Sequence, residues 1–138
     1  METTYDYQRE RILGMLFFLV AFAAICLGGL IGLFQALEHA NIKGLYPLPV
    51  VNWPYYQGLT LHGVLNALTW TTFFICGFLM IAVSRSLERP MRWIGLSWVA
   101  FVVMMIGLVL AGYAMLTGNA SVLYTFYVPM RASALHYI

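Results

Sequence analysis

The stretch ILGMLFFLVAFAAICLGGLIGLFQAL, residues 12–37, contains no charged side chain. A transmembrane helix needs about 20 consecutive apolar residues, and this stretch of about 26 can cross a bilayer with some tilt. It is too long for the apolar core of a signal peptide, and no small-residue cleavage pattern ends it. We therefore expect it to be retained as a membrane-spanning helix.

Two further apolar runs have the same character, and they cover residues 54–83 and 93–116. Each is far too long for a barrel strand and lacks strict alternation, so both are expected to be helices. The residues after Pro129 resemble the beginning of a fourth helix, starting near residue 131. The sequence predicts an all-α membrane protein, a single transmembrane region with helices at about 12–37, 54–83 and 93–116 plus the start of a fourth.

The composition excludes several other classes of protein. Of 138 residues, 62% are hydrophobic and only 9% are charged. Soluble domains are about 45–50% apolar and about a quarter charged, and disordered chains are poor in apolar residues. Seven Lys and Arg against five Asp and Glu, with no basic stripe, argue against a nucleic-acid partner. The lipid bilayer is the expected surrounding.

The basic residues predict an orientation in the membrane. The chain's N-terminal arm and the connection between the second and third runs carry most of them: Arg9, Arg11, Arg85, Arg89 and Arg92. The opposite side has only Lys43 and Arg131. The positive-inside rule therefore places the N-terminus in the cytoplasm. Aromatic side chains around residues 46–56 and 124–127 are interpreted as a belt at the outer interface.

His62 is the one ionisable residue well inside a predicted span, roughly 10 Å below the outer interface at 1.5 Å per residue. A proton relay would need acidic partners, which the first two spans lack, and a closed zinc site would need four ligands. A structural hydrogen bond between helices and an axial haem ligand both remain open. His39 and His136 lie near helix ends or loops, and we interpret them as solvated interfacial imidazoles.

Small and polar residues surround His62. Asn66 follows one turn later on the same helix face, and Gly28 and Gly32 have the spacing that lets two helices approach closely. Helix packing alone would explain that spacing, but Gly32 also lies at about the depth of His62, where a flat macrocycle edge could rest. A ligating histidine usually donates its other ring N–H to an oxygen. We expect this oxygen on the first helix near Gly28–Gly32, and not on Asn66.

The block YYQGLTLHGVLNA, residues 55–67, closely resembles the second helix of subunit I of the B-family (ba-type) haem–copper cytochrome c oxidases. VLYTFYVP at 122–129 and FQAL at 34–37 also match, in the same order and with similar spacing. The resemblance covers nearly the whole chain. It implies that His62 is an axial ligand of a low-spin haem b, and that Tyr124 lines the approach of oxygen. Asn66 and Tyr127 match positions close to the cofactors.

The resemblance also shows what this chain lacks. Only the first of the family's haem and copper histidine ligands is present, so no catalytic residue is expected here and the chain cannot reduce oxygen alone. The high-spin haem and copper are expected on the remainder of subunit I, whether that is a separate chain or the rest of a longer one. The implied partners are that remainder, a subunit II with a binuclear copper site, and cytochrome c or quinol as electron donor.

The predicted function is the N-terminal part of the catalytic subunit of a terminal respiratory oxidase, part of a larger haem–copper oxidase helix bundle. The assembled enzyme would pass electrons through haem b to an oxygen-reducing haem–copper centre, coupled to proton translocation. The expected location is a prokaryotic plasma membrane, as a multi-pass protein. A quinol oxidase or nitric oxide reductase relative stays open, as does a non-enzymatic membrane subunit in which His62 is structural.

Overall fold

The computed structural model describes residues 7–42, 55–123, 125 and 130–137. Helix α1 covers Gln8–His39. A second helix runs continuously from Tyr55 to Ser86 and consists of α2 (Tyr55–Gly63), a π-helical segment η1 (Val64–Thr69) and α3 (Trp70–Ser86). Helix α4 covers Ile94–Leu116. All three are long and apolar enough to cross a membrane, which confirms the predicted fold class.

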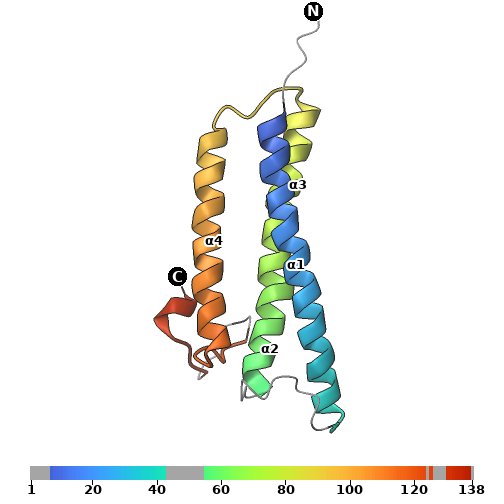
Figure 1. Cartoon of the computed structure of the whole chain (residues 1–138), viewed down its shortest axis with the longest axis vertical. Coiled ribbons are helices and arrows are strands. Elements are labelled where there is room, and N and C mark those ends of the chain that lie inside the picture. Colours follow the sequence, from blue (N-terminus) through green and yellow to red (C-terminus); the bar gives the residue numbers. More distant parts are fainter. Residues whose placement is uncertain (1–6, 43–54, 124, 126–129, 138) are drawn as a thin grey trace, which may run out of the picture.

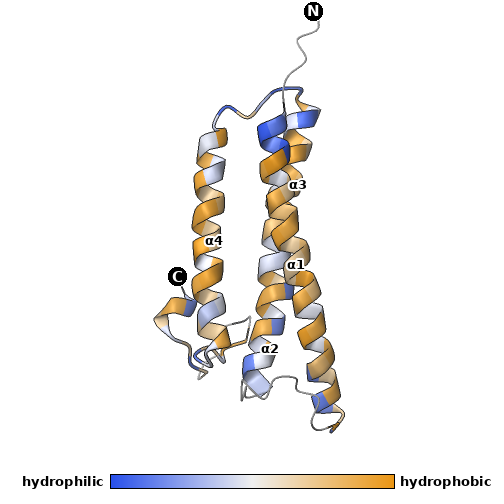
Figure 2. Ribbon diagram, in the orientation of Figure 1, coloured by the Kyte–Doolittle hydropathy of each residue, from blue (hydrophilic) through white to orange (hydrophobic). Residues whose placement is uncertain are grey.

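The helices alternate in direction (Figure 1). The start of α1, the end of α3 and the start of α4 lie at one end, and the end of α1, the start of α2 and the end of α4 lie at the other. Figure 2 shows polar residues gathered toward the helix ends and apolar residues along the middle. This separation is what a hydrocarbon slab between two aqueous layers requires.

The segment expected to begin a fourth helix has a different structure. Residues 134–136 form a single 3-10 turn, η2 (Ala134–His136), and Ala132 pairs with Ala120 in an isolated antiparallel bridge. The Ser133 N–H donates to the Asn119 carbonyl over 2.7 Å, and the Ser121 N–H donates to the Arg131 carbonyl over 3.2 Å. Because residues 131–133 bond to the chain after α4, their backbone groups are satisfied in an extended conformation.

Two apolar clusters hold the helices together. Leu13, Phe17 and Ala21 of α1 pack with Phe73 of α3, and Phe101 of α4 meets Phe17 edge-on with ring centroids 4.9 Å apart. Edge-to-face contact is a favoured geometry for aromatic rings. Nearer the other end, a second cluster joins the second helix to the end of α4: Leu61, Val64, Ala114, Met115 and Ala120.

Helices α1 and α3 approach each other closely at a pair of glycines, Gly14 and Gly77. A Cβ atom added to Gly77 would lie 2.9 Å from the Phe17 Cβ and 3.0 Å from the Gly14 carbonyl oxygen. Within a membrane, such close approach increases the van der Waals contact that holds helices together. Gly77 therefore cannot gain a side chain without moving the two helices apart, whereas a Cβ on Gly14 would meet the side chain of Ile81.

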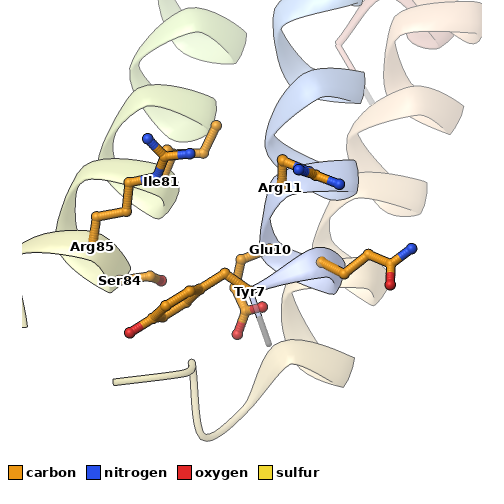
Figure 3. Close-up of a pocket in the computed structure, with 7 residues that line it drawn as sticks. Tyr7, Glu10, Arg11, Ile81, Ser84 and Arg85 are labelled. Atoms are coloured by element: carbon orange, nitrogen blue, oxygen red, sulfur yellow. The ribbon is translucent and has the colours of Figure 1, made fainter. Parts of the chain in front are cut away.

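At the arginine-rich end, the buried side chain of Glu10 connects the start of α1 to the segment between α3 and α4. Glu10 is only 4% exposed, and its Oε1 accepts a hydrogen bond of 2.8 Å from the Met91 N–H in the connection between α3 and α4. Figure 3 shows this residue in a pocket between α1 and α3, whose lining residues are Tyr7, Gln8, Glu10, Arg11, Ile81, Ser84 and Arg85. The pocket is at the opposite end of these helices from His62.

The close contact at Gly77 generates a stability prediction. Gly77→Ala should destabilise the assembled membrane protein by about 1–3 kcal/mol, the usual range for overpacking. Gly112→Ala is the matched control, because a Cβ added there meets no atom of another described residue within 4 Å beyond its own stretch of helix. Alanine also favours a helix by about 1 kcal/mol over glycine, so the control should be neutral or slightly stabilising. Thermal unfolding in detergent measures both, and equal midpoints for the two variants would contradict the packing described.

Candidate functional site

His62 lies in the last turn of α2, and its ring reaches α1. The ring Nδ1 is 2.7 Å from the Gly28 carbonyl oxygen. A carbonyl can only accept, so Nδ1 carries the proton and donates it. This contact confirms the expected hydrogen bond to the Gly28–Gly32 segment of the first helix.

Asn66 is a second neighbour of the same ring. Its Nδ2 lies 3.0 Å from His62 Nδ1 and 2.9 Å from the backbone carbonyl oxygen of His62. Because the Nδ1 proton is directed to Gly28, the amide N–H of Asn66 donates to the His62 carbonyl. Asn66 thus packs beside the imidazole, as its position on the shared helix face predicts, while α1 provides the acceptor.

This arrangement selects one tautomer of His62. With the proton on Nδ1, the Nε2 atom keeps its lone pair, and no described residue forms a hydrogen bond to it. A metal-binding histidine typically has this form, with one nitrogen free for the metal and the other hydrogen-bonded to a carbonyl. The side chain is half-buried, so the ring is not enclosed on all sides by this chain.

Glycine is required at positions 28 and 32 because the side chains of Asn66 and His62 lie directly against the backbone of α1 there. A Cβ atom on Gly32 would lie 2.7 Å from His62 Nδ1, and one on Gly28 would lie under 3.0 Å from the side-chain atoms of Asn66. A Cβ added to Gly29 would meet no side chain of the described part of the chain within 4 Å. Two of the three glycines therefore form a recess in α1 that accommodates the imidazole and the amide.

The π-helical segment η1 begins two residues after His62 and contains Asn66. A π turn holds one more residue than an α turn, and such segments occur frequently at functional sites. The extra residue in the turn changes the direction of the side chains of α3, around the helix axis, relative to those of α2. Sequence reasoning missed this feature, because the apolar residues that form it have no distinctive propensity.

The remaining residues singled out from the sequence have varied outcomes. Tyr124 and Tyr127 lie outside the described residues. His39 is exposed at the end of α1, as expected.

The interpretation of His136 as a solvated imidazole is wrong: the residue is 7% exposed, and burial lowers its pKa. Its ring packs edge-on against Tyr137, which the short turn of η2 brings next to it.

Sequence reasoning also missed two buried polar residues on α2. Gln57 and Thr60 are both fully buried, and both form hydrogen bonds to the end of α4 or to the chain that follows it. A signal was present in the sequence, because these uncharged polar residues interrupt an otherwise apolar helix. Their spacing from His62 places them away from the face that meets α1.

Comparison with known proteins gives a consistent result. Residues 12–138 match the family described as cytochrome c and quinol oxidase polypeptide I. The cytochrome c oxidase subunit 1 of Thermus thermophilus is 39% identical over 140 residues, which cover 97% of this chain and 24% of that protein. The chain thus spans about a quarter of the length of this relative. It belongs to the cytochrome c and quinol oxidase polypeptide I family.

Proposed function

We propose that this chain is the N-terminal part of the catalytic subunit of a terminal respiratory oxidase, in which His62 is an axial ligand of a low-spin haem b. One observation carries the proposal: Nδ1 of His62 is hydrogen-bonded to the Gly28 carbonyl, so the other ring nitrogen, Nε2, is the one available to a metal. Family membership supports it independently, since the similar Thermus protein is named a cytochrome c oxidase subunit.

The residues around His62 fit a haem. Haem iron takes one protein nitrogen on each face of the ring, so a single imidazole from this chain suffices for one face. The hydrogen bond to Gly28 fixes the orientation of the imidazole plane. Because Gly32 has no side chain, the imidazole can lie directly against α1. A bound haem would supply one-electron transfer at its iron.

The wider function involves parts beyond this chain. We propose that the remainder of subunit I holds the high-spin haem and copper where oxygen is reduced, and that a subunit II with a binuclear copper site is a partner. Tyr124 and Tyr127 are proposed to lie close to the cofactors. The chain would cross a prokaryotic plasma membrane with its arginine-rich end in the cytoplasm and would support proton translocation by the assembled enzyme.

The electron donor has two candidates. The Thermus relative is named for cytochrome c, whereas the description of the family also includes quinol. A quinol-oxidising enzyme is therefore the second proposal. The two are distinguished by whether the purified complex oxidises reduced cytochrome c or a quinol, and by the presence of a binuclear copper signal from subunit II.

The haem-ligand role predicts the effect of His62→Ala in the complete oxidase that contains this chain. The low-spin b-type bands of the reduced-minus-oxidised difference spectrum should be lost, because no nitrogen would remain on that face of the iron. Added imidazole should restore part of the signal. His39→Ala, at an exposed position, should leave the spectrum as in the parent. Unchanged bands in the assembled His62→Ala complex would exclude His62 as a ligand.

The recess in α1 predicts a difference between two neighbouring glycine variants. Gly32→Ala places a methyl group 2.7 Å from His62 Nδ1, so the ring must shift at a cost of about 1–3 kcal/mol. The low-spin haem content per protein should fall. In Gly29→Ala the new methyl group meets no described side chain within 4 Å, so this variant should retain the parental haem content. A pyridine haemochrome assay measures both, and equal haem content would argue against the recess as the histidine's support.

A further inference from the structure

Helix α2 is held on two sides. His62 connects it to α1, whereas Gln57 and Thr60 connect it to the end of α4 and the chain that follows. Gln57 and Thr60 are both 0% exposed. Polar side chains buried to this extent must have hydrogen-bond partners, because an unsatisfied buried group costs about 1–3 kcal/mol.

Gln57 bonds through both ends of its amide. Its Nε2 donates to the backbone carbonyl of Met115, which is in the last turn of α4. Its Oε1 accepts a hydrogen bond of 2.9 Å from the Ser121 hydroxyl. The last carbonyls of a helix lack the donor four residues further on that interior carbonyls have. The Met115 carbonyl accepts a long hydrogen bond of 3.4 Å from the Gly118 N–H, and the Gln57 amide adds a second donor to it.

Thr60 adds a second connection one turn later. Its Oγ1 accepts a hydrogen bond of 2.9 Å from the Leu123 N–H and donates to the Tyr56 carbonyl over 2.7 Å. The hydroxyl therefore links the backbone of α2 to the backbone after α4. Together the two side chains bind residues 115, 121 and 123 to a single face of α2.

The helix geometry places these contacts opposite His62. At about 100° per residue, Gln57 and Thr60 lie about 60° apart around the helix axis. His62 lies about 140° from the first and about 160° from the second. A helix bonded on two nearly opposite faces cannot rotate about its axis without breaking one set of bonds. The direction of the His62 ring is thus fixed from both sides.

We propose that Gln57 and Thr60 are positioning residues that set the rotation of α2 and, through it, the direction in which His62 presents Nε2. This inference rests on the proposed function, because it concerns the orientation of a haem ligand. Neither residue contacts the ring itself. Their effect is transmitted through the backbone of α2, so it should alter the electronic properties of the bound haem before it alters its amount.

The test uses the complete oxidase containing this chain, with Thr60→Val and Gln57→Leu as the main variants. Electron paramagnetic resonance of the oxidised low-spin haem reports the orientation of the axial imidazole plane, and a redox titration gives the midpoint potential. We expect parental haem content in both variants, with shifted or broadened low-spin g-values and a changed potential. Thr60→Ser, which keeps the hydroxyl, should restore the parental signal.

Thr71→Val is the matched control. Among the described residues, the Thr71 hydroxyl donates only to carbonyls of its own helix, Ala67 and Leu68, and the residue is partly exposed. Its removal should leave the g-values and the potential unchanged. Ser121→Ala removes only the donor to Gln57 Oε1 and lies outside the helix, so it tests the inference even where a variant within α2 fails to assemble. It should shift the signal in the same direction, by less.

Parental g-values and potential in Thr60→Val, Gln57→Leu and Ser121→Ala would overturn the inference. So would a shift of the same size in Thr71→Val, which would indicate a general effect of substitution in this helix. His62→Ala distinguishes the ligand role of His62 from the positioning role of Gln57 and Thr60. If it abolishes the low-spin signal while the positioning variants leave that signal unchanged, the proposed function stands and the positioning role fails. If the signal survives His62→Ala, the proposed function itself fails.

Discussion

The hydrogen bond from His62 Nδ1 to the Gly28 carbonyl is the interaction on which the site depends. It joins two helices that are long and apolar enough to cross a membrane, and in hydrocarbon a donor and an acceptor have few alternative partners. It requires α1 to lie close to α2, and the glycines at 28 and 32 make that distance attainable. It also determines which ring nitrogen stays available. The glycine spacing, the tautomer and the proposed ligand role therefore follow from one contact.

The membrane sets much of what the sequence can predict. A hydrocarbon layer of fixed thickness requires long apolar helices, so the three spans could be read from residues 12–37, 54–83 and 93–116 alone. Helical periodicity placed Asn66 beside His62, and the glycine spacing indicated the acceptor on α1. These features follow from continuous apolar runs or from the regular spacing of residues along a helix, and the structure agrees with them.

The features that escaped prediction depend on contacts between distant segments. Glu10 is buried because the connection after α3 folds back onto the start of α1, and Gln57 is buried because the end of α4 packs over α2. The 3-10 turn at residues 134–136 replaces an expected helix because the preceding residues bond to the chain after α4. The π-helical η1 is a separate case, because nothing in its sequence distinguishes it from the α-helical segments on either side.

The most direct test of the account is an experimental structure of the complete oxidase containing this chain, at a resolution that shows the orientation of the His62 ring. The account predicts that Nε2 is coordinated to the iron of a low-spin haem while Nδ1 remains within hydrogen-bond distance of the Gly28 carbonyl oxygen. A ring turned so that Nδ1 faces the iron, or a low-spin haem ligated on that face by another residue, would contradict it.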